Sequence, residues 1–586
     1  MSLDESEISF PQANIAAIKG IAGVLAPSLG PVSHDKFIGE RTASQGASSP
    51  GGVAYDEYVV TGDGRTILDA LPLEHPIAPV VRRVAGDEFP EDTETVGEHV
   101  TDGVTSTVLL LASLLDEAET LLEQGVHPTT VRQGYVDALS IATDSLRDSC
   151  QRLDSFSDPA AAELAVARTA MTGNDVGGMA DRWAEFACEA AAEVGYPTPE
   201  TFGVEGVSTG SIEDSRLLRG TVLPRNEITS ERMPTAVDDA TVLVLSGFER
   251  GDAGDGRVGG LRNPELTQEA TIEVSEPGDI VGYEDLYAER RGEIIRALIE
   301  HDVDVVVTRL GIDDRYRRQL ADAGILAVRG VNRLKLARIA KATGANQVRD
   351  PSDISADDLG YAGRVEQQRA EKRSRRRGRR RIVVFDGCRN PDSMTVFLRG
   401  NWGELNSEAA RQLRKATAAV ASARGEHGRS AGVVPGGGAA DIGVARDVRA
   451  AAPETGSRSQ LAMDAFADAV ERIPYGLAKN AGLDPISTLA DLREAASNTG
   501  YETGLVLPEG VVTDVEERGV LDPFALKTWS YVTAVEVAGA VLRIDDAIDA
   551  KTSREPADEG DVIFDDHAEK HQDHLDEHGT DGTVWE

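Results

Sequence analysis

Lysine is scarce in this 586-residue chain, because only ten of its 60 basic residues are Lys and the rest are Arg. Acidic residues number 100, which gives a formal net charge of −40. A surface this acidic and this poor in Lys indicates adaptation to a cytoplasm of high salt, where ions screen the repulsion between carboxylates. An ordinary acidic cytosolic protein is the alternative. In either case the charge argues against general binding to nucleic acid.

Cysteines and long apolar runs are also rare. Cys150, Cys188 and Cys388 lie far apart without CxxC spacing, which argues against a structural zinc site or a disulfide framework and fits a reducing compartment. The longest apolar stretch, 104–115, is interrupted by Thr and Ser and is too short to span a bilayer. The acidic, polar start at 1–7 does not resemble a signal peptide. We therefore expect a soluble, cytoplasmic protein without a membrane partner.

The pattern of apolar residues changes along the chain, whose length predicts two to four domains. Helical spacing dominates both ends, for example at 13–26, 101–125 and 461–481. The middle third alternates helical patterns with short apolar runs such as 241–245 and 303–307, which are typical of buried strands. This alternation predicts an α/β domain inserted into a helical one.

Glycine loops next to carboxylates are the candidate sites for binding phosphate and Mg²⁺. Glycine lets backbone N–H groups approach a phosphate closely, a helix N-terminus adds partial positive charge, and a carboxylate can hold Mg²⁺. The sequence has no GxxxxGK[ST] loop, so the common P-loop folds are not indicated. Taken singly, a segment such as Asp63-Gly64 indicates no more than a turn.

The order of these loops along the chain is more specific than any one of them. The segments are Leu29-Gly30-Pro31 with Asp35-Lys36, Asp63-Gly64 before Thr66-Ile67-Leu68, Asp102-Gly103-Val104-Thr105-Ser106, Gly125-Val126-His127-Pro128, Val434-Pro435-Gly436-Gly437-Gly438-Ala439, Asn480-Ala481-Gly482-Leu483-Asp484-Pro485, Gly519-Val520-Leu521-Asp522-Pro523 and Leu542-Arg543-Ile544-Asp545-Asp546. Together they resemble the motifs of the group II chaperonins, the ATP-driven protein-folding rings of archaea and eukaryotes.

The resemblance implies an α+β multidomain chaperonin fold. In it, a helical equatorial domain binds ATP, a small intermediate domain acts as a hinge, and an inserted α/β apical domain binds substrate and carries a helical lid protrusion. The implied boundaries are 1–155 and 429–550 for the equatorial domain, 156–222 and 373–428 for the intermediate domain, 223–372 for the apical domain with its lid near 259–289, and 551–586 for a disordered acidic tail.

The same resemblance implies ATP and Mg²⁺ as cofactors and assigns residues to them. The implied cofactor-binding residues are Gly30, Pro31, Gly64, Asp102, Gly103, Thr105, Ser106, Gly437 and Asp522. Asp102 is expected to hold Mg²⁺, Asp522 to meet the ribose, and Asp63 to act in catalysis. Each also fits a plain structural role, as a turn glycine, a helix N-cap or a solvated acid.

The pattern breaks where the γ-phosphate is expected. The family uses two aspartates there; one corresponds to Asp63, but the other position, counted from the strand at 395–400, is Lys415. A charged lysine cannot accept a proton from water, although it can grip phosphate. Asn174 stands where the family has a lysine, Val32 and Ser33 stand where it usually has Lys and Gly, and Arg65 replaces a small residue. Ordinary drift, with another residue covering the lost role, is one explanation; the one we favour is a subunit that binds nucleotide but hydrolyses it slowly or not at all.

The sequence thus predicts an ATP-binding chaperone subunit of a double ring, made of identical or sister subunits, that encloses unfolded polypeptides. The alternative is a non-hydrolysing structural or regulatory member of a mixed ring or scaffold. The Arg-rich run at 373–381 suits an acidic partner or nucleic acid, but an exposed hairpin tip is the preferred interpretation. Residues 43–52 and 87–98 resemble insertions.

Overall fold

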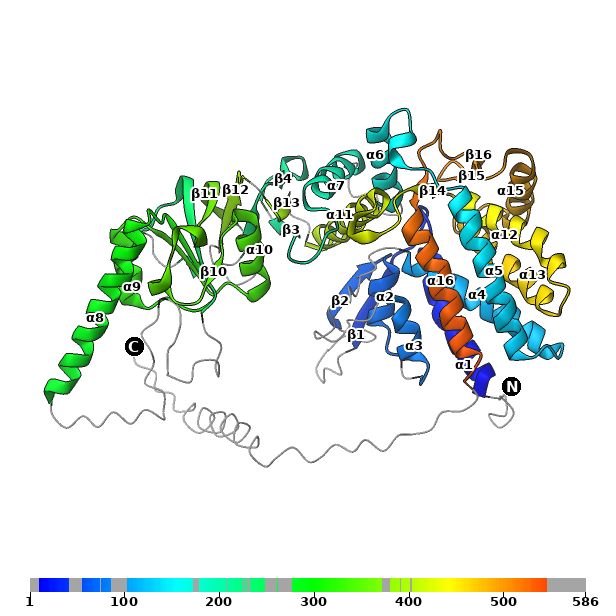
Figure 1. Ribbon diagram of the computed structural model, residues 1–586, viewed down its shortest axis with the longest axis horizontal. Helices are drawn as coiled ribbons and strands as arrows, with labels where there is room; N and C mark the ends of the chain where they lie inside the picture. Colours follow the sequence, from blue (N-terminus) through cyan, green and yellow to red (C-terminus); the bar gives the residue numbers. More distant parts are fainter. Residues whose placement is uncertain are drawn as a thin grey trace, which may run out of the picture. The chain divides into compact units, whose positions relative to one another are not determined.

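The two ends of the chain meet in one bundle of helices in the computed structural model (Figure 1). The structure describes residues 10–41, 55–73, 75–85, 103–171, 179–207, 209–224, 227–228, 232–247, 261, 277–370, 380–389, 391–400 and 403–544. The helices of the bundle are α1 (Phe10–Leu25), α4 (Val104–Glu123), α5 (Pro128–Asp148), α12 (Ala439–Ala451), α13 (Ser459–Val470) and α16 (Phe524–Val541). Helix α4 packs against α1, α13 and α16, so segments from opposite ends of the sequence lie side by side.

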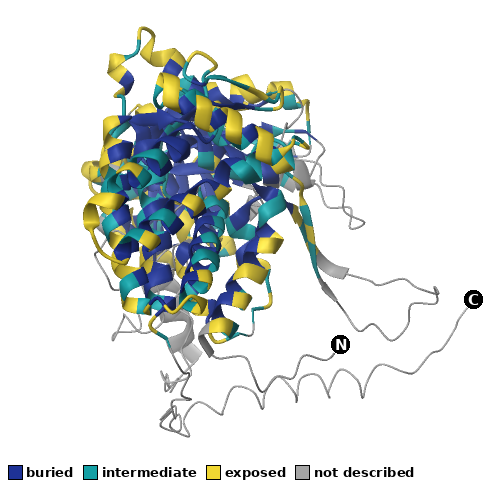
Figure 2. Ribbon diagram, turned by 90° about the vertical axis from the view of Figure 1, so that its right-hand side faces the viewer, coloured by how far each residue is buried: buried dark blue, intermediate teal, exposed yellow. Residues whose placement is uncertain are grey.

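Buried apolar and aromatic side chains hold this bundle together (Figure 2). Phe466 of α13 packs against Tyr135 of α5 and Tyr531 of α16, and each pair of ring centroids is 6.3 Å apart. Burying an aromatic side chain contributes about 1.5–3 kcal/mol relative to leaving it exposed. The Tyr135 hydroxyl donates a hydrogen bond of 2.6 Å to the carbonyl oxygen of Leu114, so its polar end is satisfied inside the core.

Shorter elements and turns extend this helical part of the chain. They are β1 (Lys36–Arg41), β2 (Tyr55–Thr61), α2 (Gly64–Ala70), α3 (Ala78–Arg82), β14 (Val433–Pro435), α14 (Arg472–Asn480), α15 (Pro485–Thr499), β15 (Thr503–Val506), β16 (Val511–Asp514) and β17 (Leu521–Pro523). Strands β14 and β17 pair antiparallel, which ties the glycine-containing motifs at 434–439 and 519–523 to each other.

A second apolar core is rich in alanine and is built from two separate stretches of sequence. Its elements are α6 (Pro159–Met171), α7 (Ala180–Val194), α11 (Gly403–Arg424) and a sheet of β3 (Phe202–Val207), β13 (Met394–Arg399) and β4 (Arg216–Leu218) in the order β3–β13–β4. Helix α11 packs on α6 and α7, and the guanidinium of Arg424 donates two hydrogen bonds, of 3.0 and 2.7 Å, to the carboxylate of Glu163. The domain boundaries given above remain a prediction.

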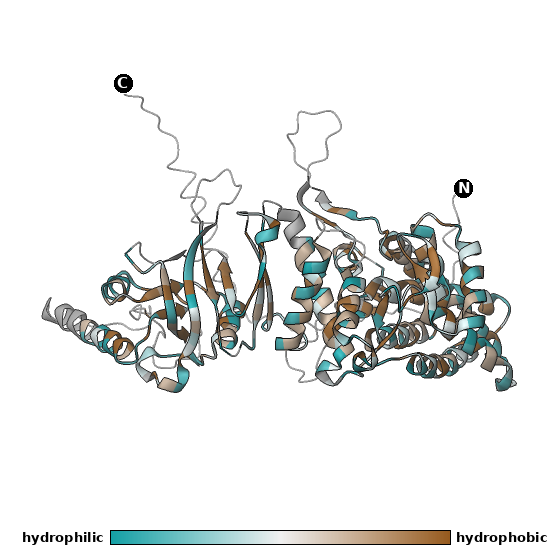
Figure 3. Ribbon diagram, turned by 90° about the horizontal axis from the view of Figure 1, so that it is seen from above, coloured by the Kyte–Doolittle hydropathy of each residue, from teal (hydrophilic) through white to brown (hydrophobic). Residues whose placement is uncertain are grey.

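The middle of the chain forms a mixed sheet with helices, in agreement with its predicted α/β character. The strand order is β5 (Thr221–Pro224), β12 (Arg380–Asp386), β11 (Gly360–Ala370), β7 (Ala236–Leu245), β8 (Val305–Thr308), β9 (Leu326–Arg329) and β6 (Glu227–Ile228), with β10 (Gln347–Val348) paired to β7. The helices are α8 (Pro277–Glu300), α9 (Asp314–Asp322) and α10 (Arg333–Thr343). Strands β7, β8 and β9 are parallel and continuously apolar where they are buried (Figure 3), as expected for strands covered on both faces.

The segment 461–481, predicted to be helical, forms two helices, α13 and α14. Pro474 lies at the start of the second helix. It has no N–H to donate to the carbonyl oxygen of Val470, and its ring clashes with a carbonyl placed one helical turn earlier. The helix therefore breaks at Glu471, and α14 contributes Ile473 and Leu477 to the pocket described below.

Several predicted features fall outside the described residues. These are the insertions at 43–52 and 87–98, the tail at 551–586, most of the Arg-rich run and, apart from residue 261, the first part of the predicted lid. Helix α8 begins at Pro277 and so covers the end of the predicted lid. Strands β11 and β12 form an antiparallel hairpin on either side of the Arg-rich run, which agrees with the hairpin interpretation. Among the described helices, none has both the length and the apolar character to cross a bilayer.

Candidate functional site

A pocket of about 430 Å³ collects loops from both ends of the chain. Its lining includes the predicted residues Gly30, Pro31, Asp63, Gly64, Gly103, Thr105, Ser106, Gly437 and Asp522. Asp102 lies outside the described residues, although its neighbour Gly103 lines the pocket. The structure therefore brings every predicted site residue that it describes into one place.

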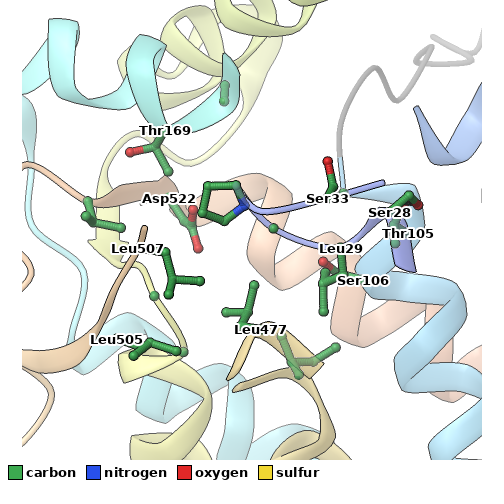
Figure 4. Close-up of a pocket in the computed structure, with 18 of the residues that line it drawn as sticks. Ser28, Leu29, Ser33, Thr105, Ser106, Thr169, Leu477, Leu505, Leu507 and Asp522 are labelled. Atoms are coloured by element: carbon green, nitrogen blue, oxygen red, sulfur yellow. Dashed lines mark hydrogen bonds between the residues drawn. The ribbon is translucent and has the colours of Figure 1, made fainter. Parts of the chain in front are cut away.

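The pocket is polar on one side and apolar on another (Figure 4). Thr105 and Ser106 lie at the start of α4, with the Thr105 hydroxyl 3.5 Å from that of Ser28, and Asp522 lies across the pocket from them. The apolar lining comes from Leu477 of α14, Leu505 of β15 and Leu507 of the turn after β15. This division suits a ligand with one anionic end and one flat, apolar end.

Two long helices begin at the pocket. Gly103 is the N-cap of α4 with φ of +84°, and Gly438 is the N-cap of α12 with φ of +82°. The first N–H groups of a helix have no partner within it, and the helix dipole adds partial positive charge at the same end. The starts of α4 and α12 therefore offer donors to an anion in the pocket, although the first N–H of α12, that of Ala439, already donates to the Gly436 carbonyl oxygen.

Close approaches of backbone to backbone explain two of the predicted glycines. A Cβ on Gly437, whose φ is +60°, would lie 2.5 Å from the carbonyl oxygen of Leu505. A Cβ on Gly64 would lie 3.0 Å from the backbone nitrogen of Thr105. At Gly437 the backbone would have to shift, and at Gly64 the Thr105 backbone would have to give by a few tenths of an ångström. Glycine is therefore required for these loops to close around the pocket.

Asp63 and Lys415, which the sequence places at the reaction centre, form an ion pair. The Lys415 Nζ lies 2.6 Å from the Asp63 Oδ1, and the two side chains are 17% and 8% exposed. The other oxygen, Oδ2, accepts hydrogen bonds from the backbone N–H and the hydroxyl of Thr66, at 2.9 and 2.7 Å, and so caps α2. Burial alone would raise the pKa of Asp63, but the Lys415 ammonium and the Thr66 donors outweigh it and lower that pKa. Asp63 is therefore a carboxylate with both oxygens engaged.

A second buried ion pair was not found from the sequence. The Lys527 Nζ of α16 lies 2.7 Å from one oxygen of Asp441 in α12, and the Tyr531 hydroxyl donates to the other oxygen, also at 2.7 Å. Burial would lower the pKa of Lys527, but the charges of Asp441 and Asp522 outweigh it and raise that pKa. Lys527 and Asp441 both line the pocket, so a fixed positive charge stands next to Asp522.

The remaining departures from the family pattern differ in whether they line the pocket. Arg65 does not line the pocket; its Nε lies 3.7 Å from the Asp69 carboxylate on the exposed side of α2. Ser33 does line it. Asn174 lies outside the described residues. Gln412, one turn before Lys415 on α11, also lines the pocket and was not singled out from the sequence.

The described residues contain no cluster of three His, Cys, Asp or Glu side chains that suits a metal ion. A Mg²⁺ bound with a nucleotide does not need one, because one or two carboxylates, phosphate oxygens and water complete its shell. Asp63 and Asp441 are each paired with a lysine, which makes them poor metal ligands. The Mg²⁺ role of Asp102 therefore stays a prediction.

Comparison with known proteins agrees with this geometry. The chain matches the TCP-1/cpn60 chaperonin family over residues 21–552. It is 34% identical to thermosome subunit alpha of Archaeoglobus fulgidus over 92% of this chain and 91% of that protein. It is 35% identical to thermosome subunit alpha of Halobacterium salinarum and to thermosome subunit 1 of Haloferax volcanii, in each case over 92% of this chain and 88% of the relative. The chain therefore belongs to the TCP-1/cpn60 chaperonin family and, within it, to the group II chaperonins.

Proposed function

We propose that the chain is an ATP-binding subunit of a double-ring chaperonin that encloses unfolded polypeptides and hydrolyses ATP slowly. The observation that carries the slow hydrolysis is the ion pair between Lys415 and Asp63. Family membership supports the other parts of the proposal, which are ATP binding, a ring of identical or sister subunits, and a polypeptide substrate. A cytoplasmic location belongs to the same proposal.

The pocket suits Mg·ATP by its own features and by the residue roles that the family resemblance implies. Phosphates would accept hydrogen bonds from the first N–H groups of α4 and α12 and from the hydroxyls of Thr105 and Ser106. The ribose would meet Asp522, and the base would lie among the leucines on the apolar side. Mg²⁺, held with Asp102, would neutralise phosphate charge. When bound, the nucleotide supplies the energy of its phosphoanhydride bond.

Hydrolysis needs a group that orients water and charge stabilisation around the transferred phosphoryl group. In this chain Asp63 is held by Lys415, which itself has no lone pair to offer water while it is charged. Removing such a group from a phosphoryl-transfer site costs about a hundred-fold in rate. ATP binding survives, because the glycine loops and helix N-termini are intact.

The test is turnover measured together with binding, on protein purified in molar salt from cells that lack the host chaperonin genes. We expect ATP to bind, with steady-state turnover about a hundred-fold below that of an active thermosome measured in parallel. Turnover equal to the active relative would overturn the slow-hydrolysis proposal. Failure to bind ATP would overturn the assignment of the pocket. Complete absence of turnover would favour the alternative, a structural or regulatory ring member.

A further inference from the structure

Gln412 has an unusual position for a polar side chain. It lies on α11 and lines the pocket, yet the residue is only 7% exposed. Its Nε2 donates a hydrogen bond of 2.7 Å to the Oε1 of Glu408, one turn earlier on the same helix. The Glu408 carboxylate also accepts from Arg411, so it is an acceptor toward both neighbours. This bond fixes which way the Gln412 amide points, since only its NH₂ group can donate.

The Oε1 of Gln412 is therefore a buried acceptor, and in the described part of the chain it has no hydrogen-bond partner. Leaving such a group unsatisfied destabilises the folded protein. Other buried side-chain atoms in the described residues also lack partners, but Gln412 is the only residue among them that lines the pocket. A water molecule or ligand in the pocket would remove this cost.

The neighbours of Gln412 limit what else can orient water near it. Lys415 is three residues further along α11, so the two side chains lie on adjacent positions of one helix face. Lys415 occupies one oxygen of Asp63, and Thr66 occupies the other. The carboxylate that a chaperonin would use is thus engaged, while Gln412, which lines the same pocket, has an amide oxygen without a protein partner in the described part of the chain. In other phosphoryl-transfer enzymes a glutamine amide orients the attacking water.

We propose that Gln412 orients the attacking water in the residual ATP hydrolysis of this chain, an inference that rests on the function proposed above. Its Oε1 accepts a hydrogen bond from one O–H of the water. The water oxygen forms the new bond to the γ-phosphorus, and the bond from that phosphorus to the bridging oxygen breaks, leaving its electron pair on ADP. The proton of the water leaves with the phosphate product, because an amide does not take it up. Gln412 thus positions water without acting as a base, which fits slow turnover.

The test compares Gln412→Leu, which keeps the size of the side chain and removes the amide, with the full-length protein in molar salt. The matched control is Gln133→Leu. Gln133 is also a helical glutamine whose Nε2 bonds a carboxylate one turn away, that of Asp137 at 2.8 Å, but it is exposed and lies outside the pocket. Hydrolysis is followed under single-turnover conditions with protein in excess over radiolabelled ATP, and affinity is measured with a non-hydrolysable analogue.

We expect Gln412→Leu to slow the chemical step about tenfold or more with the affinity unchanged within about twofold, and Gln133→Leu to change neither. A purely structural role for Gln412 would lower affinity and thermal stability as well. A second comparison uses the Lys415→Asp background, where a restored carboxylate can orient the water. There Gln412→Leu should have a much smaller effect, because two groups that share one role are not additive.

Each outcome separates this inference from the proposed function. Slow, equal rates for the unmodified protein and Gln412→Leu would overturn the role of Gln412 and leave the proposed function intact. ATP binding without any turnover in the unmodified protein would also overturn the role of Gln412, and it would favour the structural or regulatory ring member over slow hydrolysis. Rates typical of an active thermosome in the unmodified protein would instead overturn the proposed function. If Gln412→Leu does not fold, Gln412→Met gives the same comparison with a more adaptable side chain.

Discussion

At Asp63, each carboxylate oxygen already has a partner, Lys415 on one side and Thr66 on the other. A base must have a lone pair directed at the water it activates. Breaking the contact with Lys415 would free one oxygen but would remove the ion pair between two largely buried charges. The residue that replaced one aspartate therefore also restrains the other.

An aspartate at position 415 should remove the restraint on Asp63. We expect Lys415→Asp to raise ATP turnover by about tenfold or more, because it frees Asp63 and adds a second acceptor. Adding Asn174→Lys should raise turnover further, since the family places a lysine there. The measurement is steady-state ATPase in molar salt. Lys415→Met is the control: it frees Asp63 without adding an acceptor, and a gain as large as that of Lys415→Asp would contradict this account.

The ion pair between Asp63 and Lys415 also leads to a prediction about the stability of the fold. Because the pKa of Asp63 is lowered in the folded protein, the ion pair stabilises the fold above the unfolded pKa of about 3.9, and this stabilisation is lost as the pH falls through the folded pKa. Lys415→Met leaves a buried carboxylate unpaired, which costs about 3–5 kcal/mol. We expect a lower apparent melting temperature at pH 7 and a difference that shrinks at acid pH.

The double variant Asp63→Asn/Lys415→Met serves as the control for that experiment. It removes both charges, so most of the lost stability should return. A double variant as unstable as Lys415→Met alone would show that packing of the lysine stem, and not the unpaired carboxylate, causes the loss.

At the level of single residues, the sequence located the site but not its pairings. Asp63 and Lys415 were both assigned to the reaction centre, yet their contact depends on how α11 packs beside the Asp63 turn, which no local pattern records. Lys527 and Asp441 escaped notice for a similar reason. Their pair joins two helices, and α16 is apolar on most sides, so no amphipathic stripe marks Lys527 as special.

At the level of elements, the glycine loops place helix starts around the pocket. A side chain at Gly437 would meet the Leu505 carbonyl oxygen at 2.5 Å and push apart the turn before α12 and the strand β15. We expect Gly437→Ala to weaken ATP binding by about tenfold, equivalent to about 1.4 kcal/mol. Isothermal titration with a non-hydrolysable analogue measures this directly.

Gly456→Ala is a matched control for that change. Gly456 has nearly the same backbone conformation, with φ of +57°, but a Cβ there meets nothing within 4 Å, and the residue lies outside the pocket. Both variants carry the strain of a left-handed residue, about 1–2 kcal/mol, so a similar loss of stability is expected from that source. Equal effects of the two on ATP affinity would contradict the role given to the Gly437 approach.

Elements with strong local signals were predictable, and those set by packing were not. Helix α4 follows its apolar spacing from a glycine N-cap to the turn at Gly125. The apolar spacing runs through 461–481 without interruption, so only Pro474 could have indicated the break between α13 and α14. The short strands β14 and β17 exist through their mutual pairing, so three residues of sequence could not reveal them.

At the scale of the whole molecule, the net charge of −40 opposes any assembly that brings subunits together. The screening length is about 10 Å at 0.1 M salt and about 3 Å at 1 M, so neighbouring acidic surfaces repel strongly in dilute buffer and little in molar salt. An acidic chaperonin is thus suited to a concentrated salt solution, because the contacts between its subunits have less electrostatic repulsion to overcome there.

Assembly should therefore depend on salt as well as on nucleotide. In molar salt we expect the protein to sediment as a particle many times the subunit mass of 62.3 kDa, and to dissociate as the salt is diluted. ATP should favour the particle, and slow hydrolysis should let it persist in the ATP-bound form for longer than an active thermosome does. Analytical ultracentrifugation across a salt series, with and without ATP, measures both effects. A monomer under every condition, even with sister subunits added, would refute the ring. A particle equally stable in dilute and molar salt would keep the ring but show that attractive contacts between subunits, and not screening, control its assembly.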